Sequence, residues 1–358
     1  MKFSKFSKIF YTEDALSYPL TKKIFKQFPD AKRICIPHPS RLYFKPWKEI
    51  EKISQSKENL FLTTRKENFI DKCPGSKGHL CCNYFVTKNV IGCPKDCTYC
   101  YLQAYINISA ITIFVNEENF LKEFEEFAKT GLKRIGTGEF SDSFFLDEIL
   151  DINTSLIEIV SKTNSILELK TKSSCIDKIL NLKHRGKTVV AWSINPEEII
   201  LKEEPHTASL KQRIDAMQKC IYAGYKIALH LDPIIYSENW RKNYEEMLMR
   251  VFEKINPSKV EWISLGTFRF YPVLKRILVE RFDGPQYIFG EFIRCDDGKM
   301  RYPRFLREEI YRHIKNLLLK INRNLRIYLC MESETVWKNV FGKSPFHDNN
   351  LEILFGKR

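Results

Sequence analysis

The chain has 358 residues, of which 44% are hydrophobic and 28% are charged. This composition is typical of a folded globular protein and excludes disordered and collagen-like classes. No apolar run is long enough to span a bilayer, and the start of the chain lacks the apolar core of a signal peptide, so we expect a cytoplasmic protein without a membrane partner. The formal net charge of +14 favours a polyanionic partner, nucleic acid first, although lysines spread over every solvated surface are the simpler alternative.

The first part of the chain predicts a small α/β unit. Short strands are expected at residues 9–11, 33–36 and 59–64, with a helix over 16–28. Between them, residues 41–57 interleave basic and aromatic side chains, including Arg41, Tyr43 and Trp47. Such a mixture fits contacts with phosphates and bases, or equally a helix entry that packs its rings inward.

A cysteine-rich stretch follows. Cys73, Cys81 and Cys82 flank a turn rich in glycine and proline and come directly before a denser cysteine motif. Eleven cysteines in a chain that we expect in the cytoplasm indicate metal or redox chemistry rather than disulfides. These three either hold a reactive thiol or line a pocket.

The denser motif places Cys93, Cys97 and Cys100 at the spacing C-x3-C-x2-C. Three thiolates hold three irons of a [4Fe–4S] cluster and leave the fourth iron without a protein ligand, so that it is open to a small molecule. A structural zinc site is the alternative. Zinc usually takes four protein ligands, and Cys81 or Cys82 would have to supply the fourth.

From residue 110 onward strands alternate with helices. We expect strands at 111–115, 134–139, 166–171, 188–195, 226–232 and 260–265, and helices at 117–129, 145–162, around 176–180, 209–222, 240–254 and 272–282. The alternation predicts a parallel sheet, either a partial TIM-type barrel of about six βα units or a doubly wound sheet. The expected strand ends are polar, which suits the edge where parallel barrels carry their chemistry. They hold Glu139, Ser141, Asp142, Lys170, Lys172, Ser193, Asn195, His230, Asp232 and Arg269.

The C-terminal part has a different pattern. Residues 284–303 predict a hairpin around an Asp-Gly turn, followed by a helix at 305–321 and a closing strand at 326–331. Residues 341–358 give no clear pattern. The predicted fold is therefore a partial (β/α)6 barrel over 91–283, with an N-terminal α/β extension over 1–90 and a C-terminal hairpin, helix and strand over 284–358.

The cysteine motif resembles that of the radical S-adenosylmethionine enzymes. Blocks further along make the resemblance narrower: Cys93 to Gln103, Lys170-Thr171-Lys172, Ser193-Ile194-Asn195 and Asp232-Pro233-Ile234 are similar to the spore photoproduct lyases. The resemblance runs from about residue 8 to residue 320. It implies cleavage of a methylene-bridged thymine dimer in DNA after a 5′-deoxyadenosyl radical removes a hydrogen atom, with the lesion drawn out of the base stack.

The resemblance also implies site residues. A [4Fe–4S] cluster on Cys93, Cys97 and Cys100 and S-adenosylmethionine are the expected cofactors. Contacts to S-adenosylmethionine are expected from Tyr99, Glu139, Ser141, Lys172, Ser193 and Asn195. Tyr99 and Tyr101 match tyrosines that return the hydrogen atom, and Arg269, Arg301 and Tyr302 belong to the expected nucleic-acid contact. The partners implied are damaged DNA and an electron donor such as flavodoxin or ferredoxin.

One position departs from the lyases. Their hydrogen-donor cysteine aligns with Glu139, in a Gly136-Thr137-Gly138-Glu139 element that looks like the one binding the methionyl amine in most radical enzymes. Cys81 and Cys82, together with Cys73, are the candidates for a replacement donor, and the chain looks like a sister subfamily. Two alternatives stay open: a radical enzyme acting on RNA, a peptide or a metabolite, and a non-catalytic cluster or zinc protein that binds DNA or senses redox state.

Overall fold

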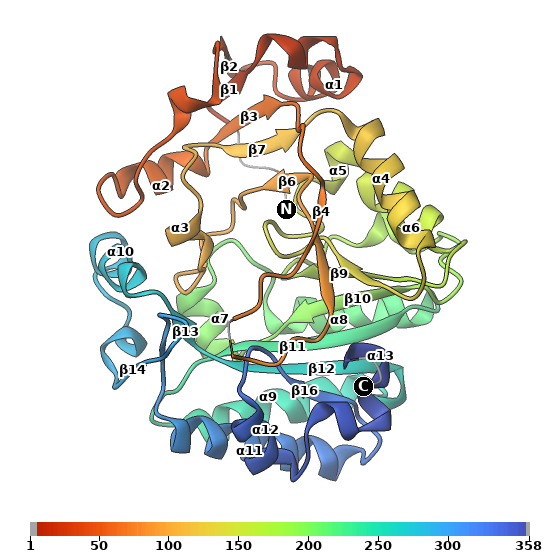
Figure 1. Cartoon of the computed structure of the whole chain (residues 1–358), viewed down its shortest axis with the longest axis vertical. Coiled ribbons are helices and arrows are strands. Elements are labelled where there is room, and N and C mark those ends of the chain that lie inside the picture. The colour runs from red at the N-terminus through yellow and green to blue at the C-terminus, as the bar shows by residue number, and fades with distance from the viewer. Residues whose placement is uncertain (1–5, 77, 356–358) are drawn as a thin grey trace.

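Two parallel sheets form the framework of the protein (Figure 1). The computed structural model describes residues 6–76 and 78–355. The smaller sheet has the strand order β2-β1-β3-β7-β6. Its strands are β1 Lys8–Tyr11, β2 Lys32–Cys35, β3 Asn59–Thr63, β6 Val90–Ile91 and β7 Ile111–Phe114. Strand β6 is antiparallel to β7, and the other neighbours are parallel.

The larger sheet is the partial barrel, a curled sheet with the order β16-β12-β11-β10-β9-β8-β5-β4. All neighbours in it are parallel except the edge pair of β4 and β5. The strands are β4 Ile70–Lys72, β5 Tyr84–Thr87, β8 Arg134–Gly136, β9 Ile166–Thr171, β10 Thr188–Ser193, β11 Lys226–Ile234, β12 Val260–Thr267 and β16 Ile327–Leu329. This confirms the predicted partial barrel, and the doubly wound alternative is wrong.

Helices surround the sheets. They are α1 Pro19–Gln27, α2 Glu51–Ser56, α3 Leu102–Tyr105, α4 Glu117–Lys129, α5 Asp147–Leu150, α6 Ile152–Val160, α7 Glu197–Glu203, α8 Leu210–Tyr222, α9 Trp240–Lys254, α10 Pro272–Phe282, α11 Arg304–Ile321, α12 Glu334–Phe341 and α13 Glu352–Phe355. The C-terminal helices α11 and α12 lie at the bottom of the view, below β12 and β16 (Figure 1). Within the described residues, no helix is both long enough and apolar enough to cross a membrane.

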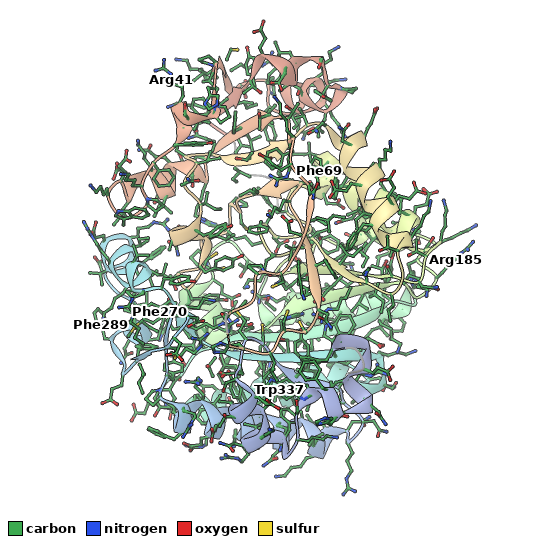
Figure 2. All side chains as sticks on the ribbon, viewed as in Figure 1. Arg41, Phe69, Arg185, Phe270, Phe289 and Trp337 are labelled. Carbon is green, nitrogen blue, oxygen red and sulfur yellow. The ribbon has the colours of Figure 1, made fainter. Side chains whose placement is uncertain are left out.

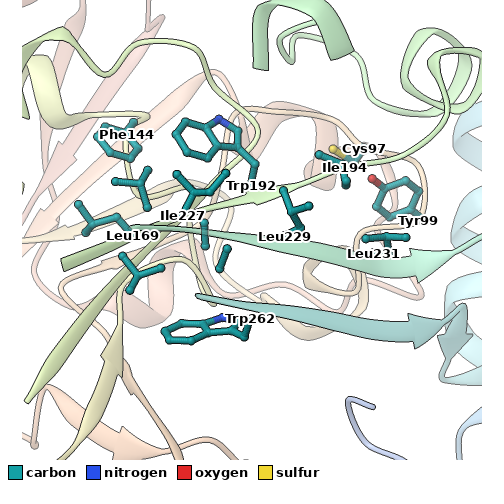
Figure 3. Packing of buried hydrophobic residues seen from close by; sticks show 14 of the residues in the cluster. Cys97, Tyr99, Phe144, Leu169, Trp192, Ile194, Ile227, Leu229, Leu231 and Trp262 are labelled. Carbon is teal, nitrogen blue, oxygen red and sulfur yellow. The ribbon is translucent and has the colours of Figure 1, made fainter. Parts of the chain in front are cut away.

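The core lies between the curled sheet and its helices, and side chains fill the interior (Figure 2). All six residues of β10 are buried, as expected of a parallel strand covered on both faces. Trp192 on β10 and Trp262 on β12 are both fully buried among leucine and isoleucine side chains (Figure 3). Cys97 and Tyr99 of the cysteine motif also belong to this core, so the motif is anchored in the barrel and does not hang from its surface.

Some sequence expectations were wrong in detail. Strand 111–115 was expected to begin the barrel, but it forms β7 of the smaller sheet, and β5 takes its place because it pairs with β8. The helix expected at 145–162 breaks into α5 and α6 at Asp151, which has a left-handed backbone with φ 58°. Around residue 178 only a 3₁₀ turn forms, and helices α7, α12 and α13 were missed.

The chain passes between the sheets more than once in its first third. Strands β4 and β5 leave the smaller sheet for the barrel, and β6 and β7 then return to it. The loop with Cys93, Cys97 and Cys100 lies on this return path. The cysteine motif therefore lies between β6 and β7, two antiparallel strands of the smaller sheet, while the proposed division at residues 90 and 283 stays a prediction.

Candidate active site

The cysteine loop begins at Gly92, which has a left-handed φ of 110°. A Cβ atom there would lie 3.2 Å from the backbone of Ile111, so both conformation and space favour glycine. The loop crosses the carboxyl edge of the barrel: the Gly92 amide donates to Phe140 O after β8, at 2.9 Å, and the Thr98 amide donates to Glu203 O after β10, also at 2.9 Å. Chemistry-bearing residues therefore gather where parallel barrels place their sites.

The three cysteine side chains of this loop are buried or half-buried and lie close to one another. Burial raises the pKa of Cys93 to about 11 and that of Cys97 still further, and the charge of Cys100 adds to both rises. Lys57, Lys95 and Lys172 oppose the rise and favour thiolates. Lys57 also fixes the loop, because its Nζ donates to Cys93 O at 3.0 Å and to Lys95 O at 2.8 Å.

The donor set fits an iron–sulfur cluster better than zinc. In the part of the chain that the structure describes, no three cysteine, histidine or carboxylate side chains converge on a single metal ion. A mononuclear zinc site requires such convergence. In a cubane each thiolate binds a different iron, so three nearby sulfurs that do not share one centre are compatible with it.

The end of β8 is shaped by two glycines. A Cβ atom at Gly136 would overlap the Tyr84 hydroxyl, and one at Gly138 would lie 2.6 Å from the backbone of Lys170. The absence of side chains lets β8 and β9 approach closely. As a result Glu139 and Lys170 meet, with Oε2 and Nζ 3.0 Å apart. Burial tends to lower the pKa of Lys170, but Glu139 and Glu168 outweigh it and raise that pKa.

Tyr101 reaches the same point from the cysteine loop. Its hydroxyl donates to Glu139 O at 2.9 Å and lies 3.3 Å from Glu139 Oε1. The ring is 41% exposed. Tyr101 and Glu139 thus lie together at the mouth of the barrel, as expected for residues of one site.

Asp142 fixes the position of the residues at the end of β9. Its carboxylate accepts from Thr171 Oγ1 at 2.7 Å and from the Lys172 amide at 2.8 Å, which ties the loop after β8 to the end of β9. Ser141 and Lys172 are half-buried there. The Lys172 ammonium lies over the ring of Tyr99, 5.6 Å from its centroid. Lys172 and Glu139 therefore contact the cysteine loop, through Tyr99 and Tyr101 respectively.

Tyr99 and Asn195 lie in a buried network instead. The Tyr99 hydroxyl donates to Glu204, and Asn195 Nδ2 donates to the same carboxylate at 3.0 Å. Arg213 pairs with Glu204, and both side chains are fully buried. Burial raises the pKa of Glu204, but the Arg213 charge outweighs it and keeps the pKa below its usual value.

This network engages two residues of the predicted site. Asn195 is 1% exposed, and its Oδ1 also accepts from Tyr244 at 3.0 Å, so its amide is engaged inside the protein. Tyr99 is 7% exposed and holds its proton against Glu204. Hydrogen-atom return by Tyr99 and cofactor contact by Asn195 stay predictions. Both side chains belong to the buried network that connects the cysteine loop to Glu204. Ser193 is also buried, and its carbonyl accepts from Arg213.

Sequence reasoning missed Glu204 and Arg213, which connect the cysteine loop to β10. Glu204 directly follows α7, a helix that the sequence did not predict. Charged residues are mostly exposed, so the sequence gives no sign that Glu204 and Arg213 are buried. Their burial depends on tertiary packing.

The expected nucleic-acid contacts are mostly internal. Arg301 is fully buried and pairs through both terminal nitrogens with Asp297, and Tyr302 is 3% exposed. Arg269 pairs with Asp232 through two hydrogen bonds of 3.0 Å. Direct DNA contact by Arg301 and Tyr302 does not fit this burial. Arg301 belongs to the small sheet of β13 Arg269–Phe270, β15 Met300–Arg301 and β14 Ile293–Arg294, and Tyr302 directly follows it.

The loop between β4 and β5 brings the remaining thiols to the mouth. Cys73 and Cys82 pack with Phe140 and Tyr84, and the Leu80 amide donates to Glu332 O beyond β16 at 2.9 Å. Burial raises the pKa of Cys73 to about 12, and the Glu139 carboxylate contributes to the rise. Burial also raises the pKa of Cys82, where Arg134 opposes the rise and Cys81 and Glu168 add to it.

A partial parallel barrel that carries a three-cysteine loop at its carboxyl edge, beside a glycine-rich strand end, defines the class of this protein. The protein is a radical S-adenosylmethionine lyase. The sequence profile of the spore photoproduct lyases matches residues 5–328, so the chain belongs to the spore photoproduct lyase family.

Individual relatives agree with this assignment. The spore photoproduct lyase of Clostridium acetobutylicum is 26% identical over 335 residues, covering 89% of this chain and 97% of that protein. The Bacillus subtilis enzyme is 28% identical over 222 residues, covering 59% of this chain and 62% of that protein.

Two solved structures share the fold. A spore photoproduct lyase complexed with dinucleoside spore photoproduct superposes with a TM-score of 0.78 at 22% identity, covering 91% of this chain and 100% of that one. A variant with bound AdoMet and the same dinucleoside has a TM-score of 0.77 at 23% identity and the same coverage.

Proposed function

We propose that this enzyme repairs a methylene-bridged thymine dimer of the spore photoproduct type in DNA. The observation that carries the proposal is the three-cysteine loop, fixed by Lys57 at the carboxyl edge of a family-typical barrel and next to Glu139. When bound, a [4Fe–4S] cluster and S-adenosylmethionine would supply a 5′-deoxyadenosyl radical. A flavodoxin or ferredoxin is the proposed electron donor, and location in the cytoplasm stays a prediction.

The residues of the chain would act by binding and positioning. Cys93, Cys97 and Cys100 would hold the cluster. Glu139, held by Lys170, would accept the methionyl amine, since a carboxylate at this edge complements an ammonium group. Ser141, Lys172 and Ser193 complete the proposed cofactor contacts. The flipped lesion would enter at the barrel mouth beside Tyr101.

The test uses protein reconstituted with iron and sulfide without oxygen, then supplied with dithionite, S-adenosylmethionine and the dinucleoside lesion. We expect 5′-deoxyadenosine and thymidine dinucleoside as products. Formation of 5′-deoxyadenosine with an unchanged lesion would contradict the repair function and leave a radical enzyme with another substrate. The Glu139 position is the observation that favours this second candidate.

A repair reaction of this kind must return a hydrogen atom to carbon, and our proposal assigns this role to Cys73. Glu139 is ion-paired and has no hydrogen to give. The Cys73 thiol is half-buried near Glu139 and keeps its proton, because burial raises its pKa to about 12. The substrate carbon radical would take the S–H hydrogen atom, forming a C–H bond and leaving a thiyl radical on Cys73. This radical would recover a hydrogen atom from Tyr101 O–H, and one electron from the proposed electron donor with one proton from solvent would restore the Tyr101 hydroxyl.

Substitution of Cys73 tests this assignment against Cys81 and Cys82. In D₂O the wild type is expected to place one deuterium in the thymine product, because thiol hydrogens exchange with solvent. Cys73→Ala should lose this deuterium, and the Cys81→Ala/Cys82→Ala variant should retain it. Equal deuterium content in Cys73→Ala and the wild type would exclude Cys73. In protein without cofactors, the dinucleoside lesion should also slow alkylation of Cys73.

A further inference from the structure

A row of exposed rings and cations lies on the N-terminal part of the protein. In the segment 41–47, exposure alternates strictly: Leu42, Phe44 and Pro46 are buried, and Arg41, Tyr43, Lys45 and Trp47 are exposed. Tyr43 is 50% exposed and Trp47 is 43% exposed. The four exposed side chains form what we call the aromatic–basic row. The sequence left open that the aromatic rings of this segment pack inward. Of its three aromatic residues, only Phe44 does so.

The row is connected to the mouth of the barrel. Its central part pairs with the residues after α3: the Phe44 amide donates to Asn107 O at 2.9 Å, and Tyr43 forms a β-bridge with Ile108. Helix α3 ends at Tyr105, whose ring is 61% exposed and lies 6.2 Å from the ring of Tyr101. The backbone that pairs with the row thus follows directly after Tyr105, whose ring lies beside that of Tyr101, the residue that contacts Glu139.

The chemistry of the row suits one kind of ligand. Large exposed aromatic side chains cost hydration free energy, so Tyr43 and Trp47, exposed in one short segment, indicate a contact surface. Alternation with arginine and lysine favours a polyanion that also carries flat rings, and an unpaired nucleic-acid strand has both. The net charge of +14 adds long-range attraction. Arg41 extends outward from this end of the molecule (Figure 2).

We propose that the aromatic–basic row binds the unpaired DNA strand next to the lesion. Bases stack on Tyr43 and Trp47, and Arg41 and Lys45 contact the phosphates. Drawing a lesion out of the duplex disrupts neighbouring pairs, and the row holds the strand so released. The choice of DNA rests on the proposed function, whereas binding of a single strand rests on the row itself.

Tryptophan fluorescence gives a direct test in protein without cofactors. Trp47 is the exposed one among the five tryptophans, and the other four are buried: Trp192, Trp240, Trp262 and Trp337. An oligo(dT) of about 16 nucleotides, long enough to cover the row, should quench the Trp47 emission on binding. Trp47→Phe should remove this quenching and keep affinity within about twofold, since phenylalanine still stacks.

Affinity measurements complete the test. Tyr43→Ala/Trp47→Ala should weaken oligo(dT) binding at least tenfold, and Arg41→Gln/Lys45→Gln should lower the salt slope by about 0.7 for each cation removed. Tyr222→Ala, at an exposed ring on α8, is the matched control and should change nothing. The affinity for a lesion-free duplex should change less than twofold in Tyr43→Ala/Trp47→Ala.

Three results would overturn the proposal: no quenching of Trp47, equal losses for single strand and duplex, or at least tenfold tighter binding of oligo(U) than of oligo(dT). Because this DNA carries no lesion and the protein no cofactor, failure here leaves the repair assay unaffected. If the lesion is not cleaved but oligo(dT) still binds, the proposed function is wrong and the row remains a binding site for single strands.

Discussion

Replacement of Cys97 by alanine is expected to reduce bound iron from about four per chain to near zero and to abolish lesion cleavage. Cys97 is a buried member of the three-cysteine loop, and the loss of one thiolate leaves two ligands for a cluster that needs three. Iron and sulfide analysis after anaerobic reconstitution is the measurement.

Two further variants serve as controls for this result. Cys35→Ala, at an exposed thiol on β2, should keep its full iron content. Cys81→Ala/Cys82→Ala should keep it too, because the proposed cluster ligands are Cys93, Cys97 and Cys100. Full iron in Cys97→Ala would refute the assignment of the loop, and a halved content in the double variant would reveal a second centre. Zinc without sulfide in the wild type would support the non-catalytic alternative.

The second large effect concerns stability. Arg213→Met should lower the free energy of unfolding by about 3–5 kcal/mol, because it leaves the Glu204 carboxylate buried without its charge partner. Arg213 also donates to Thr207 Oγ1 at 2.8 Å, to Ala208 O at 2.9 Å and to Ser193 O at 2.8 Å. Urea unfolding of protein without cofactors measures the change.

The pH dependence of this loss has a defined sign. The pKa of Glu204 is lowered in the folded protein, so its contribution is complete above the unfolded pKa and is lost as pH falls through the folded one. Without Arg213, Glu204 becomes protonated more readily, and the loss should be smaller near pH 4 than at pH 7. Arg213→Met/Glu204→Met should recover much of the stability. A loss below about 1 kcal/mol at pH 7 in the single variant would contradict the role of the pair.

Local sequence signals predicted most elements well. Helix α9 and α10 have the predicted bounds, and α8 begins after Ser209, where the side chains of Ser209 and Gln212 form a capping box. Errors arose where neighbours in space decided the outcome. Residues 111–114 have the apolar pattern of any buried strand, and only pairing with β3 assigns them to the smaller sheet.

The site divides in the same way. The spacing of Cys93, Cys97 and Cys100 is local, so the sequence by itself determined the cysteine loop, and with it the class of chemistry and the family. Tyr99 and Tyr101 are only two residues apart, yet one is bonded to buried Glu204 and the other lies exposed at Glu139. Only the tertiary structure decided this, because burial and pairing depend on residues more than thirty positions away. The same reason separates Arg301, enclosed by its own hairpin, from Tyr43 and Trp47, which stay exposed to solvent.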